Sequence, residues 1–304
     1  MSPSTPPERP ADRARVGYLG PEGTFSEEAL LASADVEAVE PVPLAGIYDT
    51  VAALRAGELD WALVPIENSL DGSISVTLDL LAEEASGVEI VAETTLRVRH
   101  SLIASRSLGL EEIETVITHP QVPGQCAAFL RGELAHARIL PASSTAEAVR
   151  SVVADGRREQ AALGTVLAAK IYGGTVIREG VEDREDNETR FVWLAQAGSG
   201  SPPLCESAAG DWRTSLVFWG AGAERPGWLV RCLDEFARRE INLTKIESRP
   251  RRDRLGSYMF FVDLGAGLDE EPVAQALVGL QTFCERVLVL GSYRTVRPSR
   301  MLAR

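Results

Sequence analysis

The sequence has few of the residues and segments on which several classes of protein depend. Its four cysteines, at positions 126, 205, 232 and 284, are far apart and form no C-x-x-C pair, and its three histidines lack metal-ligand spacing. We therefore expect reduced thiols in a cytoplasmic protein, with no structural zinc and no other metal site. No apolar run is long enough to cross a bilayer. Residues 1–14 lack the hydrophobic region of a signal peptide and predict a disordered leader.

Positive charge is scarce as well. Lys and Arg number 31 against 44 Asp and Glu, which gives a formal net charge of −13. This surplus of negative charge disfavours nucleic acid and anionic membrane surfaces as partners. The glycine-rich turns do not match phosphate loops either: Gly20–Ser26 does not fit G-x-G-x-x-G, and after Gly220–Gly222 the third glycine is replaced by Arg225. We therefore expect no nucleotide and no other cofactor.

What the sequence does contain is an alternation of buried strands and amphipathic helices. Ile47, Val51 and Leu54 recur at helical spacing and predict a helix that ends at Gly57. The apolar run at 61–66 predicts a buried strand, and a polar stretch follows its end. This alternation is typical of α/β proteins, in which ligands bind beyond the carboxyl ends of the strands.

Several of these strand ends carry polar residues or helix-start signals. Thr24 with Glu27 predicts a capping box, and Ser143–Glu147 predicts the start of another helix. The strand that ends in Thr118–Gln121 is followed by a predicted helix over residues 125–129. Polar groups from separate strand ends can therefore meet in one cleft.

The pattern changes after residue 195. Residues 196–211 are rich in Gly, Ser and Pro and predict a linker. Beyond it we expect strands at 213–219, 242–248, 257–264 and 287–290, with helices at 227–239 and 273–282. The resulting βαββαβ order predicts a ferredoxin-like unit.

The segment Asn187–Phe191 lies where an acidic loop meets an apolar strand. Its amide, hydroxyl and guanidinium groups suit an anionic small molecule. The alternative is an ordinary turn that leads into a strand.

Together these segments resemble prephenate dehydratases that carry a C-terminal ACT domain. The matching motifs, in the family's order, are Gly20–Ser26, Pro65–Ser69, Thr118–Gln121 with Gln125–Cys126, Ser143–Ala146, Asn187–Phe191 and Glu247–Pro250. The resemblance covers roughly residues 15–293. Each motif is weak alone, but six in order are a specific signal.

The resemblance implies an α/β fold with a catalytic part of two lobes, shaped like a periplasmic binding protein, over residues 15–195. The chain would cross between the lobes near 90–103 and return near 176–190, and the active site would lie between them. After the linker, the ACT domain would span 212–293, followed by a tail at 294–304. Because few residues precede the first expected strand, we expect a monofunctional enzyme without a chorismate mutase domain.

The implied reaction is decarboxylation and dehydration of prephenate to phenylpyruvate, in phenylalanine biosynthesis. Thr189 is the residue that matches the family's principal catalytic threonine, and we expect it to donate a hydrogen bond to the departing hydroxyl. The other expected substrate-binding residues are Asn68, Thr118, Gln125, Arg190, Thr24, Ser26 and Ser144. For Arg190 two roles stay open, a carboxylate clamp and a structural ion pair, because along a strand it points away from the face of Thr189.

The resemblance also implies a regulatory site. In this family phenylalanine binds between the ACT domains of two subunits, so we expect a homodimer or homotetramer whose activity falls with phenylalanine. The matching residues are Gly227, Leu229, Asn242, Leu243, Glu247 and Ser248. One departure is Trp228, where the family has alanine; its indole either faces the sheet or a partner subunit, or enters the ligand site.

Two other functions stay open at this point. Arogenate dehydratase acts on a substrate with an amino group in place of the keto group, and no residue excludes it. A non-catalytic, phenylalanine-responsive binding protein is the alternative of another class, which an intact Thr189 disfavours.

Overall fold

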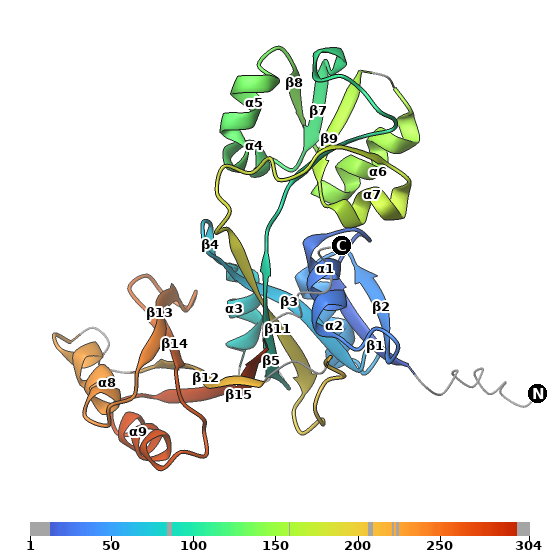
Figure 1. The fold of residues 1–304 in the computed structure, drawn as a ribbon. Coiled ribbons are helices and arrows are strands. Elements are labelled where there is room, and N and C mark those ends of the chain that lie inside the picture. The colour runs from blue at the N-terminus through green and yellow to red at the C-terminus, as the bar shows by residue number, and fades with distance from the viewer. Residues whose placement is uncertain are drawn as a thin grey trace, which may run out of the picture.

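The protein consists of two lobes and a C-terminal domain, seen in Figure 1 as the upper part, the lower centre and the lower left. The structure is a computed structural model that describes residues 13–83, 87–157, 159–205, 209–220, 222 and 225–296. Lobe 1 is formed by residues 13–97 and 188–196, lobe 2 by residues 101–178, and the C-terminal domain by residues 209–296. The predicted α/β fold, with two lobes followed by a ferredoxin-like unit, is confirmed.

Lobe 1 is built on strands in the order β2-β1-β3-β11-β5, with β4 paired to β3. The strands are β1 (Ala14–Leu19), β2 (Val39–Leu44), β3 (Trp61–Asn68), β4 (Gly72–Ser73), β5 (Val88–Arg97) and β11 (Glu188–Gln196). Helix α1 (Phe25–Ser33) packs on one face of this sheet, and α2 (Ile47–Arg55) and α3 (Ser75–Leu81) pack on the other. The predicted stop signal of α2 is present, since Gly57 has a φ of 72° just beyond the helix.

Lobe 2 has a five-stranded sheet in the order β10-β6-β9-β7-β8. Its strands are β6 (Ser101–Ala104), β7 (Thr115–Thr118), β8 (Arg138–Pro141), β9 (Gln160–Gly164) and β10 (Thr175–Arg178), and its helices are η1 (Leu110–Glu112), α4 (Val122–Gln125), α5 (Ala127–Glu133), α6 (Thr145–Asp155) and α7 (Val166–Tyr172). The single helix predicted around residues 125–129 is wrong, because Cys126 leaves helical geometry. Asp183 accepts hydrogen bonds from the backbone N–H groups of Ala127 and Ala128, which starts α5 as a new helix.

Two short segments connect the lobes, residues 98–100 and 179–187. They run side by side: the N–H of Val98 donates to the carbonyl of Asn187 at 2.8 Å, and the N–H of Val181 donates to the carbonyl of His100 at 3.0 Å. Any change in the angle between the lobes must therefore pass through this paired crossing.

The C-terminal domain has the predicted βαββαβ order. Its elements are β12 (Ala209–Trp219), α8 (Trp228–Ala237), β13 (Leu243–Pro250), β14 (Tyr258–Leu264), α9 (Glu271–Gln281) and β15 (Arg286–Val296), with strand order β13-β14-β12-β15. The first and last strands are longer than predicted. Strand β12 begins inside the expected linker 196–211, and β15 continues into the expected tail that begins at 294.

This domain is not separate from lobe 1, because their sheets are continuous. Thr295 and Val296 of β15 pair in parallel with Glu93 and Thr94 of β5, which completes a ten-stranded sheet. Gly291 lies so close to the backbone carbonyl of Ile90 that any Cβ would overlap it, so only glycine fits at this approach.

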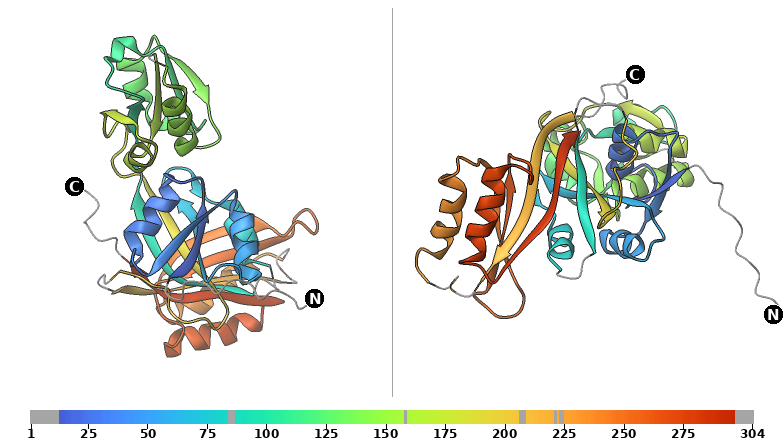
Figure 2. Two further views of the ribbon diagram at one scale, coloured as in Figure 1. Left: turned by 90° about the vertical axis from the view of Figure 1, so that its right-hand side faces the viewer. Right: turned by 90° about the horizontal axis from the view of Figure 1, so that it is seen from below.

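The central strand β12 of the C-terminal domain is buried on both faces, whereas every second residue of the edge strand β13 is exposed. Helices α8 and α9 cover the outer face of the sheet, as the view from below in Figure 2 shows. Leu216 and Phe218 pack against these helices. The alternate residues Val217 and Trp219 point to the other face and share one core with lobe 1. The sequence pattern predicts two separate domains, and it carries no signal of this shared core.

Of the leader predicted over 1–14, residues 1–12 lie outside the described residues, whereas Ala14 already begins β1. Of the tail, residues 297–304 also lie outside them. The capping box is half formed: Thr24 accepts from the N–H of Glu27, but the Glu27 carboxylate accepts from the N–H of Gly23 and not from that of Thr24. Among the described residues, no helix is both long and apolar enough to span a bilayer.

Candidate active site

Asn68 and Thr189 lie opposite each other at the ends of β3 and β11. The amide nitrogen Nδ2 of Asn68 donates a hydrogen bond to Oγ1 of Thr189 at 2.9 Å. Its orientation is fixed, because Oδ1 accepts from the N–H groups of Leu70 and Asp71, both at 2.9 Å. A hydroxyl that accepts such a bond keeps its own hydrogen available for donation. Thr189 is half-buried, so a ligand can reach that hydrogen.

A chain of neutral groups extends from this pair into lobe 2. Asn68 Nδ2 also donates to Oδ1 of Asn187 at 2.8 Å. The Nδ2 of Asn187 in turn donates a long hydrogen bond to Oε1 of Gln125 at 3.5 Å. Gln125 reaches back to lobe 1, since its Nε2 donates to Oδ2 of Asp71 at 3.1 Å. Residues 68, 125 and 189, predicted from three separate motifs, therefore meet at one place between the lobes.

His100, in the crossing segment, contacts the same glutamine: its Nε2 lies 2.9 Å from Oε1 of Gln125. The histidine is 1% exposed, and burial lowers its pKa from the ordinary value of 6.5. A neutral ring bound to an amide oxygen must be protonated at Nε2, which assigns the tautomer from the hydrogen bond. The edge-to-face ring of Phe25, with centroids 5.4 Å apart, holds it from lobe 1.

His100 and Asn187 were not among the predicted site residues. Asn187 was within reach of sequence reasoning, because it begins the motif that contains Thr189. For His100 the sequence carries no signal: its role depends on where the chain crosses between the lobes.

Four other predicted substrate-binding residues lie at a strand end or at helix starts. Thr118 is 1% exposed at the end of β7, and its hydroxyl donates to the carbonyl of Leu163 at 3.0 Å. Thr24 and Ser144 are the N-caps of α1 and α6, and Ser26 is buried in the first turn of α1. Helix N-termini attract anions, which is compatible with carboxylate binding, but the structure places none of these four in direct contact with Thr189.

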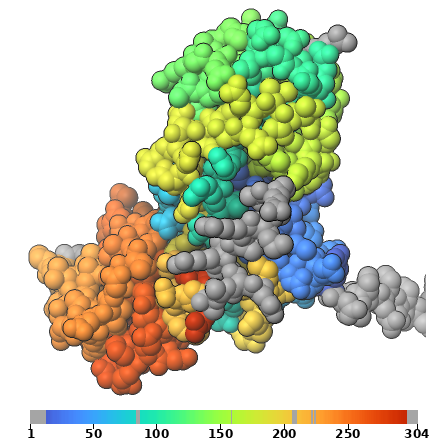
Figure 3. Space-filling view, viewed as in Figure 1, coloured from blue at the N-terminus to red at the C-terminus, as the bar shows by residue number. Residues whose placement is uncertain are grey.

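The lobes also touch at the first motif. Thr165 donates to the carbonyl of Gly23 at 2.7 Å, and the Tyr172 hydroxyl donates to the carbonyl of Glu22 at 2.8 Å. Gly23 has a φ of 83°, and a Cβ there would lie 2.8 Å from Cα of Ala168. Glycine is therefore required both by the turn and by the contact. Figure 3 shows lobe 2 resting on lobe 1, with the C-terminal domain at the side.

Arg190 lies on the opposite face of β11 from Thr189. Its guanidinium Nη1 is 2.6 Å from Oδ2 of Asp263 in the C-terminal domain, and its side chain is 12% exposed. Burial opposes its charge, but the neighbouring Asp263, Tyr293 and Glu93 raise its pKa above the ordinary value. Of the two roles left open for Arg190, this placement favours the structural ion pair.

The residues expected to sense phenylalanine lie at the start of α8 and along β13. Gly227 is the N-cap of α8 with a φ of 81°, and Asn242 is exposed just before β13. Leu229 and Leu243 are partly buried against the core of the domain. Glu247 and Ser248 face opposite ways: Glu247 accepts a hydrogen bond from Ser73 of lobe 1, whereas Ser248 is exposed.

Trp228 faces the sheet of the C-terminal domain. It is 2% exposed, packs near the rings of Phe218 and Phe260, and donates its indole N–H to the carbonyl of Phe283 at 2.8 Å. Of the alternatives for this residue, the structure places the indole in the core.

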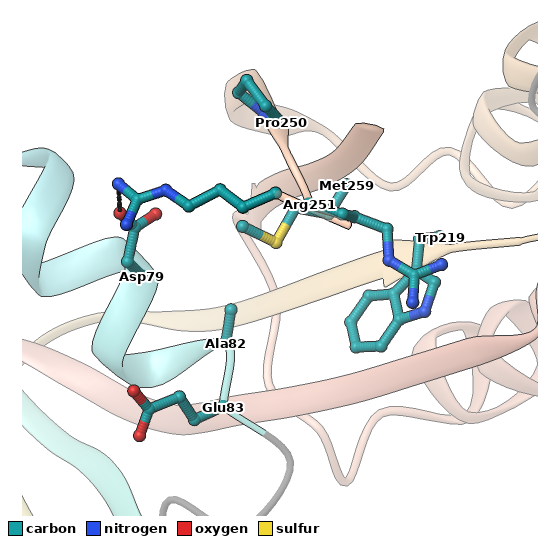
Figure 4. Close-up of a pocket in the computed structure, with 8 residues that line it drawn as sticks. Asp79, Ala82, Glu83, Trp219, Pro250, Arg251 and Met259 are labelled. Atoms are coloured by element: carbon teal, nitrogen blue, oxygen red, sulfur yellow. Dashed lines mark hydrogen bonds and ion pairs between the residues drawn. The ribbon is translucent and has the colours of Figure 1, made fainter. Parts of the chain in front are cut away.

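A cavity of about 320 Å³ lies elsewhere, at the junction between α3 and the C-terminal domain. Figure 4 shows Trp219 and Met259 on its apolar side, Arg251 over the Trp219 ring, and Asp79 at the opposite wall. None of the predicted site residues lines it. The described residues form no cluster of three or more His, Cys, Asp or Glu side chains suited to a metal.

Comparisons with known proteins identify the family. The prephenate dehydratase family matches residues 16–199, and the ACT domain matches residues 222–280. Prephenate dehydratase of Mycolicibacterium vanbaalenii is 38% identical over 293 residues, which span 92% of this chain and 91% of that protein. The enzyme of Mycobacterium tuberculosis is 39% identical over 289 residues, spanning 92% of this chain and 87% of that protein.

Solved structures give the same family and one different activity. Prephenate dehydratase of Arthrobacter aurescens, solved in complex with L-Phe, has a TM-score of 0.82 at 32% identity and covers 92% of this chain and 89% of that one. GqqA, described as a novel type of quorum quenching acylase, has a TM-score of 0.80 at 28% identity and covers 95% of this chain and 100% of that one. With a family match over most of its length, this chain belongs to the prephenate dehydratase family and carries a C-terminal ACT domain.

Proposed function

We propose that this chain is a carbon–oxygen lyase that converts prephenate to phenylpyruvate, with Thr189 as the residue that assists the leaving hydroxyl. The observation that carries the proposal is the hydrogen bond from Asn68 Nδ2 to Thr189 Oγ1 at 2.9 Å. Because the Thr189 oxygen accepts this bond, its own hydrogen remains available to a ligand between the lobes.

The chemistry suits such a donor. Prephenate loses a ring carboxylate as CO₂; the electrons of the broken carbon–carbon bond enter the ring, and the hydroxyl at the opposite ring carbon leaves with its bonding pair. A threonine is too weak an acid to transfer a proton fully, but a fixed donor stabilises the charge that develops on the departing oxygen. Removing one donor of this kind typically lowers the rate by about 10²–10³-fold.

The hydrogen-bonded groups from Thr189 to Gln125 are neutral and meet a carboxylate, Asp71, only beyond Gln125, which supports the same reaction. Asn68, Asn187 and Gln125 offer amides, and burial keeps His100 neutral at pH 7. A carboxylate that must leave as CO₂ gains nothing from a tight ion pair, because such a pair stabilises the ground state. Thr118, Thr24, Ser26 and Ser144 are the proposed further contacts for the rest of the substrate.

The experiment is direct. Purified protein is incubated with prephenate, and phenylpyruvate is measured by its absorbance in alkali; arogenate is offered in parallel, with phenylalanine as the product to detect. Turnover of prephenate that Thr189→Ala lowers by about 10²–10³-fold supports the proposal. Faster turnover of arogenate would assign the related activity, and no turnover of either would leave the non-catalytic binding protein.

The similarity to GqqA raises the question of an acylase, which the geometry at Thr189 does not favour. A threonine that attacks an acyl group needs an adjacent base to take its proton. Here the partner of the Thr189 oxygen is the Asn68 amide, which is itself a donor.

We also propose that L-phenylalanine regulates the chain through its C-terminal domain. The Arthrobacter aurescens enzyme was solved in complex with L-Phe, and the residues proposed to bind it here are Gly227, Leu229, Asn242, Leu243, Glu247 and Ser248. The proposed site lies between the ACT domains of two subunits, so the chain would be at least a dimer. Calorimetry with phenylalanine, beside light scattering for the mass of the assembly, tests both parts.

A further inference from the structure

Charged contacts join the C-terminal domain to lobe 1 directly behind Thr189. Arg190 follows Thr189 in β11, and its Nη1 lies 2.6 Å from Oδ2 of Asp263 in β14. Asp263 is 5% exposed, and its other oxygen accepts from the Ser215 hydroxyl at 2.6 Å. Breaking a buried pair of this kind leaves an uncompensated charge, so the pair fixes β11 against the C-terminal domain.

The partner of Thr189 is connected to the same domain. Glu67 precedes Asn68 in β3, and its Oε2 lies 3.2 Å from Nζ of Lys245 in β13. The Lys245 ammonium also donates to Oγ of Ser73 at 2.6 Å, and Ser73 donates to Glu247. Ser73 is in β4, whose Gly72 pairs with Asn68. Both residues that form the catalytic hydrogen bond are thus next to a residue that contacts the C-terminal domain.

The Arg190 guanidinium has capacity for a second partner. Its Nη1 bonds to Asp263, while Nε and Nη2 are buried and donate no hydrogen bond to the other described residues. Nη2 lies 3.5 Å from Oε2 of Glu67, which is a weak ion pair without a well-formed hydrogen bond. The third carboxylate nearby, Glu93, is already held by Arg213 at 2.5 and 2.7 Å. Glu67 is shared with Lys245, but it is the carboxylate that lies near the unbonded Nη2, so it can take up the guanidinium when the pair with Asp263 weakens.

We propose that Arg190 is a positioning residue through which the C-terminal domain controls turnover. Its ion pair with Asp263 holds Thr189 in place, and a shift of the C-terminal domain weakens that pair in favour of Glu67, which disturbs Asn68. This inference rests on the proposed function of Thr189. An effector acts through the network because it binds one of the two arrangements more tightly than the other.

The test compares Asp263→Asn with a matched variant at the same junction. Asn keeps the size of the side chain and removes its charge. We expect Asp263→Asn to lower kcat about tenfold, to leave KM near the wild-type value, and to lose most of the inhibition by phenylalanine. Arg190→Lys keeps the charge but not the planar fork, and should lower kcat in the same direction.

The matched control is Asp79→Asn. Asp79 pairs with Arg249 at 2.8 Å and with Arg252 at 2.6 Å, which also joins lobe 1 to the C-terminal domain, but α3 carries no residue of the Thr189 network. This variant should keep kcat, KM and the response to phenylalanine. Equal losses in both variants would mean that the charged junction acts only by stabilising the fold, and would overturn the proposal.

The other outcomes distinguish failure of the inference about Arg190 from failure of the proposed function. Wild-type kcat in Asp263→Asn also overturns the inference while the proposed function stands. If Asp263→Asn does not fold, the same measurements on Arg190→Lys decide, with an unchanged kcat as the contrary result. Absence of turnover in the wild-type protein would instead remove the proposed function itself.

Discussion

The two junctions of lobe 1 differ in kind. Its contacts with lobe 2 are single hydrogen bonds, such as those that Thr165 donates to the carbonyl of Gly23 and Gln125 donates to Asp71. Towards the C-terminal domain it offers a continuous sheet, a shared apolar core and buried ion pairs such as Arg190 with Asp263. One junction can open by exchanging a few bonds with water, and the other cannot.

This difference assigns separate tasks to the two junctions. A neutral hydrogen bond contributes roughly 0.5–1.5 kcal/mol net, so the contacts between the lobes can break and re-form as substrate enters. Detaching the C-terminal domain would expose core residues such as Trp219 and Tyr293 and unpair buried charges. A ligand on the C-terminal domain can therefore affect lobe 1 only through small shifts within the continuous sheet. The two lobes, in contrast, can move apart and open the cleft.

The largest effect is expected in the cleft itself. Thr189→Ala should lower kcat by about 10²–10³-fold without unfolding the protein, because it removes one fixed donor from a half-buried position. Thr189→Ser keeps the hydroxyl and should retain substantial activity. Steady-state kinetics with prephenate and circular dichroism check both. Near-normal turnover of Thr189→Ala would remove the residue from the mechanism.

The second prediction tests whether contact between the lobes matters for turnover. Gly23→Ala places a Cβ 2.8 Å from Cα of Ala168, on a backbone with φ of 83°, and should force the lobes apart. We expect kcat to fall about tenfold, since closing the cleft is needed to orient the substrate. Small-angle scattering should show a larger radius of gyration.

Gly173→Ala is the matched control for this variant. Gly173 has a similar φ of 76°, but a Cβ there meets nothing within 4 Å. Both variants carry a similar backbone strain of about 1 kcal/mol, so a difference in kcat or in radius reports the lobe contact. Equal behaviour of the two would contradict the prediction.

The same comparison explains what the sequence could and could not predict. Local patterns predicted the strands and helices, and the resemblance to the family then picked out Asn68, Gln125 and Thr189 among the polar residues that follow or begin those elements. The pairing of β15 with β5 could not be predicted, since strand partners far apart in the chain leave no periodic signal. For the same reason the sequence left the role of Arg190 open. Alternation along the strand predicted that its side chain points away from the face of Thr189, but could not predict that Asp263 is its partner there.

Within the C-terminal domain, a smaller effect is expected from Trp228→Phe. The change removes the hydrogen bond from the indole to the carbonyl of Phe283 and some core volume, so the free energy of unfolding should fall by roughly 1–2 kcal/mol. Because the indole is in the core, affinity for phenylalanine should not change. Thermal unfolding and calorimetry check this, with Val230→Ala, at a 69% exposed position of the same helix, as the control. Weaker phenylalanine binding with unchanged stability would place Trp228 in the ligand site.

The smallest effect is a pH dependence located at the junction between the lobes. Burial lowers the pKa of His100 below its ordinary value of 6.5, so between these two values the unfolded chain binds more protons than the folded one. Stability from this residue is therefore complete above pH 6.5 and decreases as the pH falls towards the folded pKa.

The contribution of Glu28 to stability changes with pH in the opposite direction. Burial raises the pKa of Glu28 from 4.5 to about 6, although the charge of Lys170 opposes the shift. Its contribution is therefore complete below pH 4.5 and is lost as the pH rises through 6. Urea unfolding from pH 4.5 to 7.5 should show a flatter rise of stability with pH in His100→Gln than in wild type, and a steeper one in Glu28→Gln. Identical pH profiles for His100→Gln and wild type would mean that His100 is not held neutral, and the neutral character assigned to the cleft would lose its main support.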